Sequence, residues 1–406
     1  MDGMSGANHC TVGMLFFEDD PDLYAEPAAG AAQHAELDSD RPDTSGPQGA
    51  QQPAQGHNDD EPADPRKYPA VAVLSNQASE FTSLACSNDG CFLASGSDEN
   101  IIHIWNVRNQ QLLHICDGHT KPVLCLAFSP DGSELVSGSE DELAIVWSTA
   151  TGQQRLQLAG HTNDIYSVAY SPDGALIATS SVDCTVRLWD SRSGEAVSVL
   201  RGHDAMVIMT AFSPDGRLLA SSSADHTARI WHVPSGQELC RLRGHRGAVY
   251  SLAFSPDSRR IATAAEDSTA RVWNAQTGEE LVTLREHAGP VWAVVFSADG
   301  RNVVSAASDG TIKVCDSFGG ELRLSLDSGD AHGSAVAFSA NGGRVCASAE
   351  DNSIRVWNTA TGRRLAKLRG HEDKITRLQL SSDGKRVASA SDDGTLRLWD
   401  LERIIA

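Results

Sequence analysis

The sequence predicts an all-β protein assembled from eight copies of one four-stranded antiparallel sheet. Eight positions recur at an interval of 42 residues, and seven of them are tryptophan: Trp105, Trp147, Trp189, Trp231, Trp273, Cys315, Trp357 and Trp399. Turn sequences of the Ser-Pro-Asp-Gly kind recur at the same interval, and the repeats continue from residue 68 almost to the end of the chain. A unit of this length is too small to bury its apolar face alone, so the copies must pack against one another.

Residues 160–200 show how one repeat is expected to fold. The apolar-rich run 165–170 predicts a first strand, and the turn 171–174 follows it, where proline fixes φ and glycine accepts a left-handed conformation. Three further strands are expected at 176–179, 185–189 and 196–200, with turns between them. Each period therefore predicts a four-stranded antiparallel sheet.

A Gly-His pair lies 28 residues before the tryptophan in five repeats, at His119, His161, His203, His245 and His371. With the Trp-Asp ending of two repeats, at Trp189-Asp190 and Trp399-Asp400, this pattern is similar to the WD-repeat β-propeller family, whose units run from Gly-His to Trp-Asp over about 40–45 residues. The resemblance covers residues 68–400 and implies an eight-bladed β-propeller. Seven blades is the alternative if repeat 1 or repeat 7 does not form a blade.

The way the ring closes is also predicted. The chain ends just after the third strand of its last repeat, so that sheet lacks an outer strand. Residues 69–74 lie in register with residues 112–116, the outer strand of the next period. The N-terminal strand can therefore complete the last blade and remove an open, aggregation-prone edge.

Two regions are expected: a disordered acidic tail over residues 1–67 and the propeller over residues 68–406. Residues 1–66 hold 14 Asp and Glu against Arg41 and Arg66, a net charge of −12, and are too polar to offset their ordering entropy by burial. The stretch Met14–Phe17, followed by acidic residues, is either a partner-docking motif or a residual apolar cluster.

The composition of the chain indicates which kinds of partner and which cellular compartment to expect. The net charge of −21 repels phosphates, so we expect no nucleic acid and instead proteins or peptides with basic residues. Nine scattered cysteines without a Cys-x-x-Cys pair indicate a reducing compartment and no metal site. No segment approaches the roughly 18 apolar residues that span a bilayer. We expect a cytoplasmic or nuclear protein without cofactor or membrane contact, a monomer within a larger complex.

Sets of His, Ser or Thr, and Asp look like hydrolase triads but recur five times, more often than one enzyme needs. The family resemblance implies that they are structural networks with the blade's Trp, so no catalytic residue is expected. The sets are His119, Ser137, Asp141 and Trp147; His161, Thr179, Asp183 and Trp189; His203, Ser221, Asp225 and Trp231; His245, Thr263, Asp267 and Trp273; and His371, Ser389, Asp393 and Trp399.

Some repeats depart from this pattern. Repeat 1 has Gln77 and Glu99 in place of His and Asp, and repeat 6 has Cys315 in place of Trp. Repeat 7 has Gly329 in place of His and Ala347 in place of Ser. Because repeats 6 and 7 adjoin, we expect the ring to be weakest there.

The resemblance also implies that one face of the ring receives peptides, through three variable positions in each repeat. Repeats 3 to 6 place apolar residues there, and charged residues surround them. The predicted partner-binding residues are Tyr166, Met206, Ile208, Tyr250 and Trp292, flanked by Asp98, Glu140, Glu266, Glu350 and Asp392. A peptide with one apolar anchor and nearby Lys or Arg would suit this sector. The alternative is that the rings pack between neighbouring blades.

The favoured function is a non-catalytic protein-interaction scaffold. A second interpretation rests on Trp189-Asp190-Ser191-Arg192, which resembles the box of WD-repeat substrate receptors of cullin-RING ubiquitin ligases. In that box the arginine contacts the ligase adaptor, which implies this role for Arg192. Ser191 departs from the pattern, since an aliphatic residue is usual there.

Overall fold

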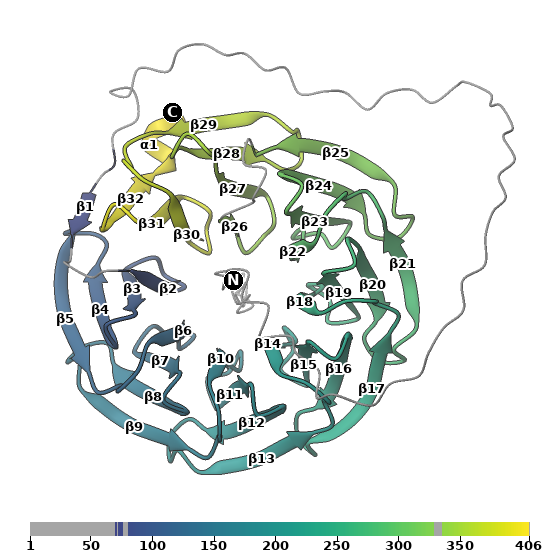
Figure 1. Ribbon diagram of the computed structural model, residues 1–406, viewed down its shortest axis with the longest axis horizontal. Coiled ribbons are helices and arrows are strands. Elements are labelled where there is room, and N and C mark those ends of the chain that lie inside the picture. The colour runs from purple at the N-terminus through teal and green to yellow at the C-terminus, as the bar shows by residue number, and fades with distance from the viewer. Residues whose placement is uncertain (1–69, 71, 76–79, 329–334, 406) are drawn as a thin grey trace, which may run out of the picture.

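The computed structural model describes residues 70, 72–75, 80–328 and 335–405 and shows eight four-stranded antiparallel sheets arranged in a closed ring (Figure 1). Blades 1 to 3 consist of β2 (Phe81–Cys86), β3 (Phe92–Ser97), β4 (Ile101–Asn106) and β5 (Gln111–Asp117); β6 (Val123–Phe128), β7 (Glu134–Ser139), β8 (Leu143–Ser148) and β9 (Gln154–Ala159); and β10 (Ile165–Tyr170), β11 (Leu176–Ser181), β12 (Thr185–Asp190) and β13 (Ala196–Arg201).

Blades 4 to 6 consist of β14 (Val207–Phe212), β15 (Leu218–Ser223), β16 (Thr227–His232) and β17 (Gln237–Arg243); β18 (Val249–Phe254), β19 (Arg260–Ala265), β20 (Ala270–Asn274) and β21 (Glu280–Leu284); and β22 (Val291–Phe296), β23 (Asn302–Ala307), β24 (Thr311–Asp316) and β25 (Leu322–Asp327). Blades 7 and 8 consist of β26 (Val336–Phe338), β27 (Arg344–Ser348), β28 (Ile354–Asn358) and β29 (Arg364–Leu368); and β30 (Ile375–Leu380), β31 (Arg386–Ser391), β32 (Thr395–Asp400) and β1 (Ala72–Ser75).

The prediction of eight blades is confirmed, and the seven-blade alternative is excluded because repeats 1 and 7 both form four-stranded sheets. In every blade the strands follow one another from the centre of the ring to its rim (Figure 1). The predicted ring closure is also confirmed, since β1 pairs antiparallel with β32 from Ala72 opposite Leu398 to Ser75 opposite Thr395.

The hydrophobic core lies between neighbouring blades. One cluster, for example, joins Ala94 and Ile104 of blade 1 to Leu126, Leu135 and Trp147 of blade 2. Alternation along the strands makes this possible, because successive side chains point to opposite faces of each sheet and both faces meet a neighbour. Every blade therefore depends on the two beside it for burial, as a small repeat requires.

Polar contacts join the blades as well. Arg260 Nη2 donates to the Gly300 carbonyl at 2.8 Å and Arg344 Nη1 to the Gly384 carbonyl at 2.6 Å. Arg386 Nη1 makes the same contact across the closure of the ring, 3.0 Å from the Gly90 carbonyl. The joint between blades 8 and 1 is thus built like the others.

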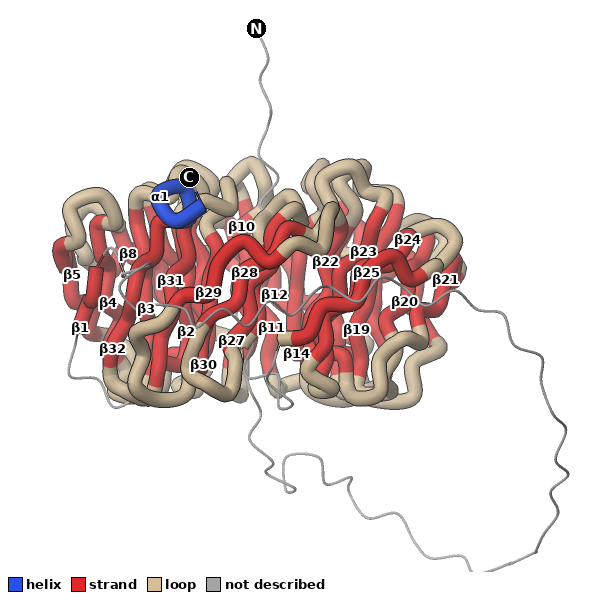
Figure 2. The backbone as a smooth tube through the Cα atoms, turned by 90° about the horizontal axis from the view of Figure 1, so that it is seen from above, coloured by secondary structure: helices blue, strands red, loops and turns tan. Residues whose placement is uncertain are grey.

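The disc has two faces (Figure 2). We call the linker face the one formed by the loops between blades and by the turns between second and third strands. The hairpin face is formed by the turns between first and second and between third and fourth strands. The short helix α1 (Leu401–Ile405), which the sequence did not lead us to expect, lies on the hairpin face, where the Leu401 N–H donates to the Lys385 carbonyl at 2.7 Å.

Some expectations lie outside the described residues. They are the disorder of the tail, the docking motif at residues 14–17, the domain boundary at residue 67, and the positions of Gln77 and Gly329. Within the described chain, no helix is long and apolar enough to cross a membrane.

Candidate partner-binding face

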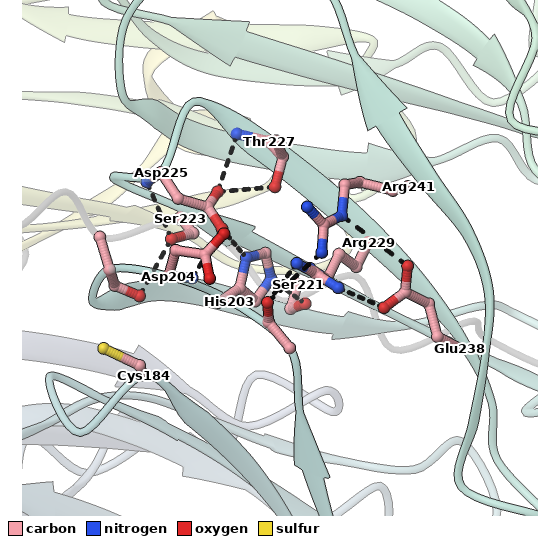
Figure 3. Close-up of polar contacts among 12 residues, drawn as sticks. Cys184, His203, Asp204, Ser221, Ser223, Asp225, Thr227, Arg229, Glu238 and Arg241 are labelled. Atoms are coloured by element: carbon pink, nitrogen blue, oxygen red, sulfur yellow. Dashed lines mark hydrogen bonds and ion pairs between the residues drawn. The ribbon is translucent and has the colours of Figure 1, made fainter.

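The His203 set of blade 4 shows how a blade with a complete set secures its linker face (Figure 3). His203 Nδ1 donates to Asp225 Oδ2 at 2.8 Å, and Ser221 Oγ lies 2.8 Å from His203 Nε2. The Trp231 indole N–H donates to the same hydroxyl oxygen at 2.9 Å. A carboxylate only accepts, so the Nδ1 atom carries the proton and Nε2 accepts from the hydroxyl. The chain of bonds therefore leaves each of these buried polar groups with a partner.

The same geometry recurs in the other four predicted sets. The His Nδ1 to Asp distances are 2.8–3.1 Å, the His Nε2 to hydroxyl distances are 2.7 Å, and the indole to hydroxyl distances are 2.8–3.0 Å. The hydroxyl oxygens are buried, as at Ser221 and Thr263, and each already accepts an indole N–H. A nucleophile would need access to substrate, which this arrangement does not give.

The carboxylates of these sets stay ionised to low pH. Burial raises the pKa of Asp225, but hydrogen bonds from His203 and Thr227 outweigh that effect and hold the pKa well below its ordinary value. Asp183, Asp267 and Asp309 follow the same rule. Burial lowers the pKa of His245 and His371 despite the aspartates beside them, so these imidazoles are neutral near pH 7.

A sixth set was missed from the sequence. In blade 6, His287 Nε2 lies 2.9 Å from Ser305 Oγ, and His287 Nδ1 donates to Asp309 at 3.2 Å. Glu286 precedes this histidine, so the Gly-His pair did not mark it. Its position 42 residues after His245 would have been sufficient to predict this set.

On the linker face, the predicted apolar sector forms one cluster over blades 3 to 5. Met206, Ile208 and Ala248 are buried in it, and Tyr166 and Tyr250 pack against it half-buried. Met206 and Ile208 are each only 7% exposed, so they support the rings above them and offer little surface to a partner. The expectation that they face a partner directly is therefore replaced by a supporting position.

The rings themselves reach the surface in part. The Tyr250 and Trp292 ring centroids lie 4.9 Å apart at an interplanar angle of 34°, and both side chains are half-buried. Trp292 also packs against the cluster between blades 6 and 7. The rings therefore pack against their neighbours and stay partly exposed, while their contact with a partner stays a prediction.

Carboxylates surround this sector. Burial and the charge of Asp164 raise the pKa of Glu140, and burial raises the pKa of Asp164 although Lys121 opposes it. Glu266 accepts the Ala248 N–H at 3.1 Å and Asp98 accepts the Glu80 N–H at 3.1 Å, while Glu350 and Asp392 are exposed.

A family model described as "WD domain, G-beta repeat" matches the chain eight times, at residues 70–106, 110–148, 152–190, 194–232, 236–274, 278–316, 326–358 and 362–400. The chain belongs to the WD40 family. Among solved structures, the chain is similar to the computationally designed Ika8 protein, with 32% identity and a TM-score of 0.72 over 82% of this chain and 99% of that chain. No match was found among curated proteins.

WD40 propellers are typical protein-interaction scaffolds and are generally not enzymes. Within the described ranges, no group of three or more His, Cys, Asp or Glu is placed to hold a metal ion. The two faces of this WD40 propeller are therefore the places where a partner is expected to bind.

Arg192, the residue of the ligase interpretation, lies on the hairpin face of blade 3 with its side chain exposed. Its main-chain carbonyl accepts Arg155 Nη1 at 3.2 Å, and the neighbouring Ser191 carbonyl accepts Arg155 Nη2. The turn is therefore held firmly while the Arg192 guanidinium projects from it. The adaptor contact stays a prediction.

The residues around the departures from the WD40 pattern differ between blade 7 and blade 6. In blade 7, Asp351 occupies the position of the network aspartate and pairs with Lys367 Nζ at 2.8 Å and Arg369 Nη2 at 3.4 Å. Burial raises its pKa, but these partners and Ser353 lower it to about 2. In blade 6, the buried Cys315 is surrounded by apolar residues such as Val303 and the half-buried Leu322.

We expect blades 6 and 7 to exchange their amide hydrogens faster than blades 2 to 5. Cys315 fills less space than tryptophan, a kind of loss that costs about 3–5 kcal/mol where neighbours do not compensate. The inner strand β26 of blade 7 has three residues where the other inner strands have six. Hydrogen exchange followed by mass spectrometry checks this, and equal protection in all eight blades would contradict it.

Proposed function

We propose that this WD40 protein is a non-catalytic scaffold that captures a peptide on its linker face through an apolar anchor and adjacent Lys or Arg. The Tyr250 and Trp292 pair carries this proposal, because two large rings 4.9 Å apart keep exposed edges above a packed apolar base. Aromatic side chains seated in this way are the usual energetic centres of interfaces.

The charge of the surroundings determines the kind of peptide. Besides burial, the charge of Asp164 raises the pKa of Glu140 and the charge of Glu142 raises the pKa of Asp164, so a cation placed beside these carboxylates would be stabilised. A guanidinium or ammonium group can also lie over the exposed ring of Tyr250 or Trp292. An acidic ligand would meet repulsion at the same place, which makes a basic peptide the best fit.

Selection of peptides from a random displayed library on the full chain tests this. We expect sequences with one aromatic or aliphatic residue next to Lys or Arg. The double variant Tyr250→Ala with Trp292→Ala should weaken their binding by about 30-fold or more, since each anchor of an interface contributes on the order of 2 kcal/mol. Binding is measured by calorimetry, with thermal unfolding of each variant in parallel.

Phe318→Ala is the matched control, because Phe318 is an aromatic residue 66% exposed on the opposite face. Its removal should leave peptide affinity unchanged. The double variant Glu140→Lys with Glu350→Lys keeps both aromatic rings and should weaken peptide binding. Selected peptides that are acidic, or that bind the ring variant as well as the parent, would refute the proposal.

A further inference from the structure

The hairpin face of blades 7 and 8 carries a surplus of positive charge. Its turns, the strand ends beside them and α1 hold six basic residues, Arg344, Arg363, Arg364, Lys385, Arg386 and Arg403, against three acidic ones, Asp383, Asp400 and Glu402. Glu402 pairs with Lys385 at 2.7 Å and Asp400 with Arg403 at 3.7 Å. Arg344 and Arg386 donate to main-chain carbonyls, which satisfies hydrogen bonds but leaves the charge. We call these residues the basic surface.

A single substitution within the repeat accounts for one of the three surplus positive charges. The turn between the first and second strands has an aspartate in seven repeats, and Asn341 replaces it in blade 7. Asn341 Oδ1 accepts the Ser339 hydroxyl at 2.8 Å and the Gly343 N–H at 2.9 Å. Asp257 accepts the equivalent groups in blade 5. The turn keeps its hydrogen bonds, and one negative charge is removed from the surface.

The chain enters the propeller beside this basic surface. Because Ala72 pairs antiparallel with Leu398, two residues before Asp400, β1 begins at the hairpin face. Ala70 packs against the cluster that also receives Ile404 and Ile405 of α1. Leu401 at the start of α1 is hydrogen-bonded to Lys385.

The sequence immediately before this entry point is strongly acidic. Residues 59–64, which lie outside the described residues, include Asp59, Asp60, Glu61 and Asp64. Asp64 is six residues from Ala70, and six extended residues span at most about 20 Å. A segment tethered so closely has an effective concentration on the order of millimolar at its neighbouring surface.

We propose that the acidic stretch 59–64 binds in cis to the basic surface of blades 7 and 8. Four carboxylates meet a surface with a surplus of three positive charges, and the tether makes their association intramolecular. On the linker face, the carboxylates of Asp98, Glu140, Glu350 and Asp392 repel the same stretch. The contact therefore covers the basic surface against other anions and leaves the linker face open. It does not depend on the function proposed above.

Zero-length carbodiimide crosslinking of the full chain at low ionic strength tests the proposal. Lys385, whose side chain is 49% exposed, is the lysine of the basic surface and can form an amide with a carboxylate of residues 59–64. We expect this crosslink in monomeric protein, measured by mass spectrometry relative to crosslinks of the same stretch to Lys67. The double variant Arg363→Glu with Arg403→Glu should lower its yield about fivefold or more, as should 1 M salt.

The matched control is Arg259→Glu with Arg301→Glu, two exposed arginines on the hairpin face of blades 5 and 6. It changes the net charge of the protein equally and should leave the Lys385 crosslink unchanged. Urea unfolding confirms that the variants fold alike. An equal yield in both double variants would overturn the proposal, because proximity of the tether alone would explain the crosslink. Crosslinks found only in dimers, or directed to Lys121 or Lys374 on the linker face, would also overturn it.

Discussion

A chain that begins at Asn76 is expected to lose about 5 kcal/mol of unfolding free energy compared with a chain that begins at Ala70. The shorter chain lacks β1, so β32 loses four residue pairings and the buried Leu74. A fully buried leucine contributes about 1.5–3 kcal/mol, and each backbone hydrogen bond a net 0.5–1.5 kcal/mol. The expected loss is a large share of the unfolding free energy of 5–15 kcal/mol that is typical of a folded domain.

The loss would also expose an edge. Leu396 and Leu398 of β32 are almost fully buried in a cluster that includes Leu74 of β1, and without β1 the β32 strand would present unpaired N–H and C=O groups. Such edges promote association between chains. Urea unfolding measures the stability and light scattering measures the association, while the chain that begins at Ala70 controls for removal of the preceding residues. Equal urea midpoints for the two chains would show that the ring does not depend on β1.

The parts of the fold that were predictable are those that the repeat itself encodes. The eight positions at the 42-residue interval predict the number of blades. The register of residues 69–74 with residues 112–116 predicts the strand that closes the ring. Five of the six complete His, hydroxyl and Asp sets followed from Gly-His pairs. His287 was missed because Glu286 precedes it, although its imidazole makes the same contacts.

The candidate site was less predictable, because a position in a repeat does not tell how far a side chain is buried by the next blade. Met206 and Ile208 occupy positions that reach the linker face, yet they pack against Ala248 of the neighbouring blade and are buried. The basic surface was not predicted from the sequence, since its residues come from three separate turns with their adjoining strand ends and from the region of α1, and they share one face because blades 7 and 8 are neighbours.

Replacing Asp225 by alanine is expected to lower the free energy of unfolding by about 3 kcal/mol. Its carboxylate accepts the His203 imidazole, the Asp204 N–H, and the N–H and hydroxyl of Thr227. Removing it leaves the buried His203 without its acceptor, and hydrogen bonds to a charged group contribute about 1.5–3 kcal/mol each before the site relaxes. Asp204→Asn is the control, because the Asp204 side chain is exposed and only its backbone joins the set.

The aspartates of these sets predict the acid sensitivity of the whole ring. For Asp393, burial raises the pKa, but Thr395, the Glu372 N–H and His371 lower it to about 2, below the ordinary value of 3.8. The unfolded chain therefore binds more protons than the folded one, so this contribution to stability is complete above about pH 4 and is lost as the pH falls through about 2. Asp183, Asp225, Asp267 and Asp309 act in the same direction.

Histidine adds a shallower effect at higher pH. Because His245 and His371 have pKa values below the ordinary 6.5, the unfolded chain binds protons there first, and stability begins to fall as the pH drops below about 6.5. Urea unfolding from pH 7 to pH 2 should therefore show a gentle decline followed by a steep one below pH 4. The Asp225→Ala variant should decline less steeply in the acid range than its parent, since one shifted carboxylate is gone. Parallel curves for the two proteins would mean that Asp225 does not contribute to the acid sensitivity, and that acid unfolds the ring through other groups.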